Sequence, residues 1–141
     1  MSASQQSILL VEDDENDVFL MERAVAKARL DLRIHIVTHG QEAIDYLAGN
    51  GRYADRSAHP LPACIFLDLK LPYVHGFEVL EWIRKQPSLA DIHVLVLTSS
   101  PEERDRQRAE RLGAKAYLVK PPTPQVLLEV LQTLCAPCLL P

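Results

Sequence analysis

The sequence contains no apolar stretch long enough to cross a membrane. A spanning helix needs about 20 consecutive apolar residues, and every apolar run among the 141 residues is interrupted well before that length. The N-terminal segment MSASQQS also lacks the basic and apolar regions of a signal peptide. We therefore expect a cytoplasmic protein without membrane contact.

Cysteine is scarce, and an excess of basic residues is absent. Cys64, Cys135 and Cys138 cannot all pair within one chain, and nothing suggests an oxidising compartment, so we interpret them as reduced thiols. The CAPC spacing at 135–138 follows the last apolar pattern, which favours a tail over a redox motif; zinc shared by two such tails is an alternative that no second feature supports. The formal net charge of −4 argues against nucleic-acid binding.

The chain has the length of one compact domain with one core. Apolar runs rich in β-branched residues alternate with segments of helical period, and about five such β-α units favour a parallel sheet covered by helices on both faces. The predicted fold class is therefore doubly wound α/β, with a core at about 7–135. The predicted strands are SILLV at 7–11, LRIHIVT at 32–38, ACIFLD at 63–68, IHVLVLT at 92–98 and AKAYLVK at 114–120.

Two segments between the strands carry signals of their own. Segment 100–113, SPEERDRQRAERLG, is predicted to form a helix that opens with Ser100 as N-cap and Pro101 at the first helical position, with Glu103 closing a capping box. Segment 49–62, GNGRYADRSAHPLP, shows no periodicity. A loop of this length is usually either functional or mobile.

Polar side chains stand where four of the predicted strands end. In open parallel sheets, ligands bind at the carboxyl ends of the strands. We therefore expect these side chains to form one site. They are Glu12, Asp13 and Asp14 after the first strand, Asp68 at the third, Thr98 at the fourth and Lys120 at the fifth.

The chemistry of this set points to a divalent cation and a phosphoryl group. Crowded carboxylates repel one another unless they hold protons or share a cation. Oxygen donors without His or Cys select Mg²⁺ or Mn²⁺, and Mg²⁺ pairs readily with phosphate oxygens. Asp68 can then attack a phosphorus atom and become an aspartyl phosphate, while Lys120 and Thr98 contact the transferred oxygens.

These residues lie in motifs that resemble the response-regulator receiver domain of two-component signalling. The segments ILLVEDD, LDLKLP, VLTSS and AYLVKPP occur in register over nearly the whole chain. The resemblance implies a five-stranded sheet in the order 2-1-3-4-5 and a single receiver domain over 1–141 without an output domain. It also implies a phosphoacceptor, not an enzyme, that assists its own phosphorylation and dephosphorylation.

The resemblance also implies the metal ligands. Asp68 is the phosphoacceptor and contacts the metal, and Asp13 is a direct Mg²⁺ ligand. The backbone carbonyl of Lys70 completes the protein ligands, and Glu12 acts through water.

The same resemblance implies which residues bind the phosphoryl group. Thr98 and Lys120 bind it, and Tyr117 matches an aromatic position whose ring moves when Thr98 is drawn to the phosphate. The Lys120–Pro121 peptide bond is expected to be cis, the isomer that aims the lysine at the site; only X-Pro bonds adopt cis at low cost.

Partners follow in part from the resemblance and in part from the last helix. The phosphoryl donor is a histidine kinase, and the long loop with TSSPEERD resembles the single-domain response regulators paired with bacterial phytochromes; the downstream protein is unidentified. In the last helix, Leu128 and Cys135 fall together outside the core-facing stripe, which favours a homodimer face there. A tail that folds back over Leu128 is the alternative.

Two other functions fit part of this pattern. An aspartate-dependent phosphatase of the haloacid dehalogenase type also forms an aspartyl phosphate. Enzymes that resemble this type share a second Asp two residues after the nucleophile, where this chain has Lys70. A receiver that is never phosphorylated would act only as an interaction module. Turnover of free phosphate esters would support the enzyme, and failure to take up phosphate would support the module.

Overall fold

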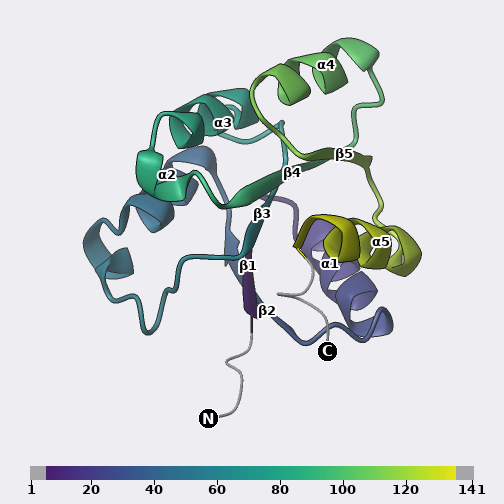
Figure 1. Cartoon of the computed structure of the whole chain (residues 1–141), viewed down its shortest axis with the longest axis horizontal. Helices are drawn as coiled ribbons and strands as arrows, with labels where there is room; N and C mark the ends of the chain where they lie inside the picture. Colours follow the sequence, from purple (N-terminus) through teal and green to yellow (C-terminus); the bar gives the residue numbers. More distant parts are fainter. Residues whose placement is uncertain (1–5, 136–141) are drawn as a thin grey trace.

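The structure is a computed structural model, and it describes residues 6–135 (Figure 1). Among these residues no helix combines the length and hydropathy that crossing a membrane requires. The strands are β1 (Gln6–Val11), β2 (Leu32–Val37), β3 (Cys64–Leu67), β4 (His93–Thr98) and β5 (Ala116–Val119). The helices are α1 (Glu15–Lys27), α2 (Gly40–Ala48), α3 (Gly76–Arg84), α4 (Glu103–Arg111) and α5 (Pro124–Cys135), with short 3-10 turns η1 (Gly51–Ala54) and η2 (Pro87–Leu89).

The five strands form one parallel sheet in the order β2-β1-β3-β4-β5. Helices α1 and α5 lie on one side of it, and α2, α3 and α4 lie on the other (Figure 1). This arrangement confirms the predicted doubly wound fold class and the strand order. It places the ends of β1, β3, β4 and β5 at one edge of the sheet.

Both faces of the sheet are buried, as the apolar strands predict. In β1, Ile8 and Leu10 pack in the layer beneath α1 and α5, while Leu9 and Val11 pack toward α2 and α3. Successive side chains of a strand point to opposite faces. A strand covered on both sides therefore reads as a continuous apolar run.

The first helix starts immediately after the acidic end of β1. Asp14 is its N-cap, and the Asp14 carboxylate accepts hydrogen bonds from the backbone N–H groups of Asn16 (2.8 Å) and Asp17 (3.2 Å). Such a cap satisfies donors that a helix end would otherwise leave unpaired. It also places the first turn of α1, including Asp17, beside the end of β1.

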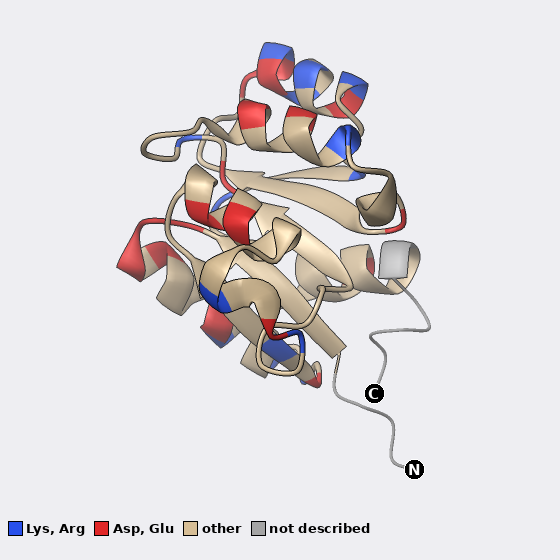
Figure 2. Ribbon diagram, turned by 90° about the vertical axis from the view of Figure 1, so that its left-hand side faces the viewer, with Lys and Arg blue, Asp and Glu red and all other residues tan. Residues whose placement is uncertain are grey.

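The predicted start of α4 is wrong by two residues. The helix begins at Glu103, and its N-cap is Glu102, whose side chain makes no capping hydrogen bond. Ser100 lies before the helix, and its hydroxyl is used by Asp105 at 2.8 Å instead of by a capping box. Basic and acidic residues alternate along the exposed surface of α4 (Figure 2).

Segment 49–62 is packed against the domain. Tyr53 in η1 is buried, and the guanidinium of Arg56 donates to the backbone carbonyls of Tyr46 (2.8 Å) and Leu47 (2.9 Å) at the end of α2. The Tyr46 hydroxyl donates to the carbonyl of Pro60 at 2.9 Å. The segment thus supplies partners for the last carbonyls of α2, which a helix cannot satisfy internally.

Candidate functional site

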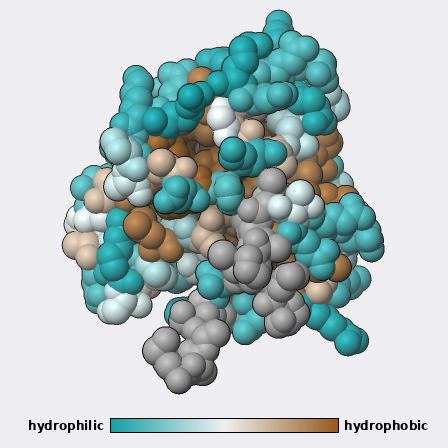
Figure 3. Space-filling model, in the orientation of Figure 1, coloured by the Kyte–Doolittle hydropathy of each residue, from teal (hydrophilic) through white to brown (hydrophobic). Residues whose placement is uncertain are grey.

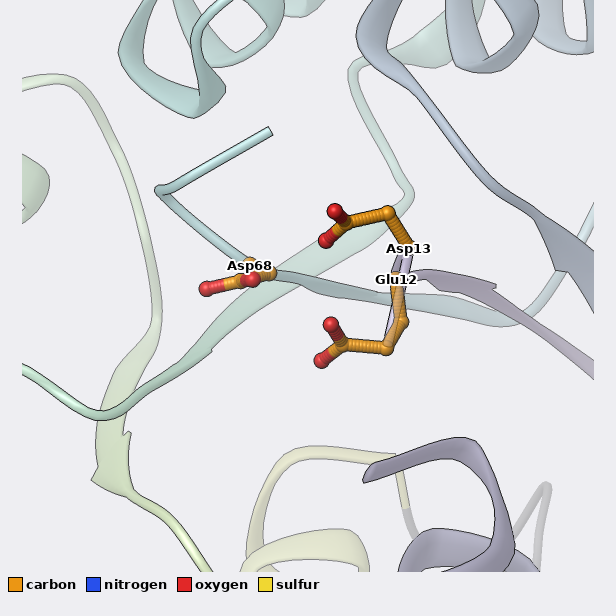
Figure 4. A group of neighbouring side chains, drawn as sticks. All are labelled: Glu12, Asp13 and Asp68. Atoms are coloured by element: carbon orange, nitrogen blue, oxygen red, sulfur yellow. The ribbon is translucent and has the colours of Figure 1, made fainter. Parts of the chain in front are cut away.

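Three carboxylates converge where β1 and β3 end. Glu12 and Asp13 follow β1, and Asp68 follows β3, which is paired directly with β1. Carboxylate oxygens of the three residues lie within 4.8 Å of one another. Glu12 and Asp68 are buried and Asp13 is exposed. Figure 4 shows Glu12 and Asp13 diverging from the end of β1, with Asp68 beside them on the neighbouring strand end. We call these residues the acidic cluster.

The ammonium group of Lys120, after β5, reaches into this cluster. Lys120 Nζ lies 2.5 Å from Glu12 Oε1 and 3.3 Å from Asp68 Oδ2. It also donates to Asp17 Oδ2, in the first turn of α1, at 2.8 Å. The lysine side chain is only 10% exposed. One buried cation therefore contacts three carboxylates from two separate segments of the chain.

Burial and these contacts shift the pKa of both partners. Burial raises the pKa of Glu12 to about 7, an effect that the hydrogen bond from Lys120 opposes and the nearby Asp68 carboxylate reinforces. For Lys120, burial alone would lower the pKa, but the hydrogen bonds to Asp17 and Glu12 outweigh it and raise the pKa above its ordinary value. The lysine is therefore charged at neutral pH, and the site favours additional positive charge.

Thr98 and Tyr117 meet at a shared neighbour, Ser100. Thr98 ends β4 and is fully buried, and its Oγ1 accepts a long hydrogen bond from the backbone N–H of Ser100 at 3.4 Å. Tyr117, on β5, is also buried, and its hydroxyl donates to the backbone carbonyl of Ser100 at 2.7 Å. The structure thus brings the two predicted switch residues into contact with the same loop, between β4 and α4.

The loop from β3 to α3 wraps closely around Asp68. The backbone N–H of Lys70 faces Asp68 Oδ1 at 3.4 Å, and the N–H of Gly76 donates to the carbonyl of Leu69 at 2.9 Å. A Cβ atom on Gly76 would lie 2.4 Å from the backbone oxygen of Asp68. The glycine of the YVHG segment is therefore required by close approach of the backbone.

The Lys120–Pro121 peptide bond is cis, the isomer expected from the sequence. The Lys120 backbone N–H donates to the carbonyl of Thr98 at 2.8 Å, which ties the end of β5 to the end of β4. The predicted site residues at four strand ends are therefore gathered at one edge.

One contact of the site was not predicted. Asp17 holds the Lys120 ammonium, although it lies five residues beyond Glu12 and belongs to a helix. Its signal in the sequence is the acidic first turn of a helix that begins directly after a strand end. Such a turn lies next to whatever the strand end binds.

The predicted dimer face consists of Leu128 and Cys135 of α5. Leu128 is half-buried and packs against the core layer beneath α1 and α5. It is therefore less available to a partner than the helical pattern suggested. The core-facing side of α5 includes residues beside its central stripe, and Leu128 is one of them. The side chain of Cys135 lies outside the described residues.

The donor set of the acidic cluster fits a hard divalent cation. All three side chains offer carboxylate oxygens, which are the ligands of Mg²⁺ and Mn²⁺. Two of the carboxylates are buried beside a single ammonium group, so their negative charge is only partly compensated. No His or Cys competes within the cluster.

Two response-regulator and regulatory proteins are similar in sequence to this chain. The chain is 37% identical over 113 residues to the response regulator Rcp1 of Synechocystis sp., an alignment that covers 80% of this chain and 75% of Rcp1. It is 39% identical over 114 residues to the "Probable methanogenesis regulatory protein FilR2" of Methanothrix harundinacea, covering 81% and 71% of the two chains.

Solved structures agree with these relatives. The bacteriophytochrome response regulator RtBRR superposes with a TM-score of 0.83 at 39% identity, over 94% of this chain and 79% of that one. The Mn²⁺-bound form of Rcp1 gives a TM-score of 0.79 at 32% identity, over 95% and 98% of the two chains. The sequence model of the protein family described as the response regulator receiver domain matches residues 8–132. Together with the fold and the acidic edge, this match shows that the chain belongs to the response regulator receiver domain family of two-component signalling.

Proposed function

We propose that Asp68 accepts a phosphoryl group from a histidine kinase in a reaction that depends on Mg²⁺ or Mn²⁺. The observation that supports this proposal is the position of Asp68: its carboxylate is buried in the acidic cluster with a lysine ammonium 3.3 Å away. Asp13 and Asp68 would hold the cation together with the Lys70 backbone carbonyl, and Glu12 would act through a water molecule. Mn²⁺ is bound in the solved form of Rcp1.

The transfer needs little covalent chemistry from the protein. A carboxylate oxygen of Asp68 attacks phosphorus, the bond from phosphorus to the histidine nitrogen of the donor breaks, and the electron pair of that bond stays on the nitrogen. A bound cation would neutralise charge on the transferred oxygens. Lys120 contributes a second positive charge beside Asp68, and the Thr98 hydroxyl can donate a hydrogen bond to a phosphoryl oxygen.

The phosphorylated form would signal through protein contacts. In this proposal residues 1–141 act as one receiver domain with no enzymatic substrate of its own, and Tyr117 transmits the state of Thr98 to the surface around β5. The kinase is a bacterial phytochrome in our proposal, because RtBRR is a bacteriophytochrome response regulator of similar sequence and fold.

The two alternative functions are less well supported. Phosphatases that resemble the haloacid dehalogenases carry a second Asp two residues after the nucleophile. This chain has Lys70 at that position. The receiver that is never phosphorylated does not account for the ion pairs of Lys120 with Glu12 and Asp68, which the acceptor chemistry uses.

Phosphorylation by a small-molecule donor tests the proposed function directly. Incubation with acetyl phosphate and Mg²⁺ is expected to add the mass of one phosphoryl group to the intact protein, and peptide mapping is expected to place it on Asp68. Chelation of Mg²⁺ should abolish this labelling. Without the cation, the site lacks the positive charge that neutralises the transferred phosphoryl oxygens. Labelling that persists without divalent metal would contradict the proposal, as would release of inorganic phosphate from simple phosphate esters.

We further propose that the face around β5 pairs two copies of the chain. Val119 is 41% exposed on this edge strand. A hollow of about 290 Å³ lies between α4 and β5, and another of about 310 Å³ lies between β5 and α5, the second lined in part by Val130. Figure 3 shows hydrophobic side chains in this region, beneath the hydrophilic surface of α4. Exposed apolar side chains that gather in one region are often covered by a partner.

Replacement of Val119 by lysine is expected to weaken self-association by about tenfold or more, which corresponds to about 1.4 kcal/mol. Two charges would meet across a symmetric interface. Sedimentation of the wild type and of Val119→Lys, with and without acetyl phosphate, measures the effect. Ile36→Lys is the matched control, since Ile36 is similarly exposed (37%) but lies on β2, the opposite edge of the sheet. A wild type that stays monomeric in both states would rule out this face as a dimer interface. A Val119→Lys variant that dimerises as the wild type does would rule it out as well.

A further inference from the structure

Ser100 is the point at which three parts of the molecule meet. It is buried, at 7% exposure, in the loop between β4 and α4. Its backbone N–H donates to Thr98 Oγ1 at 3.4 Å, and its carbonyl accepts from the Tyr117 hydroxyl at 2.7 Å. Its own hydroxyl donates to Asp105 Oδ2 at 2.8 Å. A shift of Ser100 therefore reaches Thr98, Tyr117 and helix α4 together.

The first turn of α4 contacts Tyr117 a second time, through Arg106. The Arg106 guanidinium lies 4.9 Å from the centroid of the Tyr117 ring, which is the geometry of a cation–π contact. The residue next to it in the chain, Asp105, holds the Ser100 hydroxyl. Because the side chain of the N-cap residue of α4 makes no capping hydrogen bond, these contacts help to fix the start of the helix.

We propose that Asp105 is a positioning residue for the phosphoryl site, which acts through Ser100 on the Thr98 hydroxyl and on the Tyr117 ring. This inference rests on the proposed function. Asp105 itself is half-buried on α4 and belongs to neither the acidic cluster nor the Lys120 contacts. It would set how well the switch residues are placed, without contacting the phosphoryl group.

The hydrogen bonds on Thr98 give the physical reason. A hydroxyl carries one proton and can accept as well as donate. When Thr98 Oγ1 accepts the Ser100 N–H, the hydroxyl proton of Thr98 is left free to be donated elsewhere, and a phosphoryl oxygen is the acceptor that the proposed chemistry provides. Asp105 holds Ser100 in the position from which its N–H can make this bond.

The same contacts make the coupling reciprocal. If Thr98 moves toward a phosphoryl oxygen, the bond from Ser100 must adjust, and both Tyr117 and the first turn of α4 feel the change through Ser100. By linkage, if phosphorylation changes the binding free energy of a partner that contacts α4 and Asp105, that partner changes the free energy of phosphorylation by the same amount. Asp105 would therefore connect the switch residues to the exposed surface of α4.

The position of Tyr117 can be measured without any phosphorylation. The four tyrosines are labelled with 3-fluorotyrosine, and Tyr117→Phe identifies the resonance of Tyr117 in the ¹⁹F NMR spectrum. In Asp105→Ala this resonance is expected to shift or broaden, because the Ser100 carbonyl that accepts the Tyr117 hydroxyl is no longer held. Asp105→Asn keeps a side-chain oxygen that can accept from Ser100, so it is expected to restore the wild-type resonance.

Phosphorylation kinetics provide the second measurement. With acetyl phosphate and Mg²⁺, Asp105→Ala is expected to be phosphorylated roughly three- to tenfold more slowly than the wild type, the factor that loss of one hydrogen bond carries. Asp105→Asn should recover most of the rate. Glu110→Ala is the control, since it removes an exposed carboxylate from the same helix.

Any one of three results in the Asp105 variants would overturn the inference: an unchanged Tyr117 resonance in Asp105→Ala, an unchanged phosphorylation rate in that variant, or an Asp105→Asn variant that behaves like Asp105→Ala. Equal effects of Glu110→Ala would do the same, because they would assign the change to helix charge. A wild-type protein that takes up no phosphoryl group would instead refute the proposed function, while the NMR comparison would still report whether Asp105 positions Tyr117.

Discussion

Asp68→Asn is expected to take up no phosphoryl group from acetyl phosphate or from a phosphorylated histidine kinase. The amide has no carboxylate oxygen to attack phosphorus. The fold should persist, since an amide oxygen can still face the Lys70 N–H that lies 3.4 Å from Asp68 Oδ1. Lys120 also keeps its contacts with Glu12 and Asp17. Intact mass after incubation with the donor measures the loss, and a thermal melt shows that the variant is folded.

The matched control for this variant is Asp17→Asn. Asp17 contacts the same ammonium group at 2.8 Å but contributes no oxygen to the acidic cluster. It should therefore remain phosphorylated on Asp68. If Asp68→Asn is labelled as fully as the wild type, Asp68 is not the acceptor. If Asp17→Asn also loses all labelling, the carboxylates around Lys120 do not have separate roles.

Gly76→Ala is expected to lower the stability of the protein strongly. The added Cβ would lie 2.4 Å from the backbone oxygen of Asp68 and 2.5 Å from Leu69 Cα, and backbone cannot move aside as a flexible side chain can. We expect the free energy of unfolding to fall by about 3 kcal/mol, near the upper end of the usual cost of overpacking. Urea denaturation measures this change. Phosphorylation should also slow, because the acceptor segment is displaced.

Gly51→Ala separates crowding from the general cost of replacing a glycine. At Gly51 no atom lies within 4 Å of an added Cβ, although its φ of +56° disfavours other residues. We expect a loss of about 1 kcal/mol there, from backbone conformation alone. A Gly76→Ala variant as stable as Gly51→Ala would mean that the loop after Asp68 adjusts easily.

The sequence was sufficient to predict the strand-end residues of the site. Buried parallel strands appear as continuous apolar runs, so the first polar residue after each run marks an end of a strand. Glu12, Asp68 and Lys120 follow three such runs, and parallel pairing places those ends at one edge. The ion pairs among these residues follow from their charges.

Contacts between distant segments could not be predicted in the same way. The capping box at Ser100 satisfied a local rule, but the hydroxyl is used by Asp105 and the helix begins later. Local propensity is only a weak guide where tertiary contacts compete for the same group. The fastening of segment 49–62 by Arg56 is of the same kind, since its acceptors are carbonyls of the preceding helix.

The helical pattern of α5 was also insufficient to decide what covers Leu128. A period of 3.6 residues gives the direction of a side chain about the helix axis, but it does not give the distance to the neighbouring helix. In the structure α1 lies beside α5, and Leu128 packs partly on the layer between the helices and the sheet. The remaining apolar surface of this region belongs to the edge strand.

The ion pair between Asp17 and Lys120 joins residues 103 positions apart in the chain. Contacts of such high sequence separation carry a large loop-closure entropy cost, which must be met before they stabilise the fold. A nascent chain that has not yet added β5 would carry the acidic residues without their lysine. The complete set of contacts around Lys120 can therefore exist only once the last strand has joined the sheet, and a partly synthesised chain would lack the ammonium group beside Asp68.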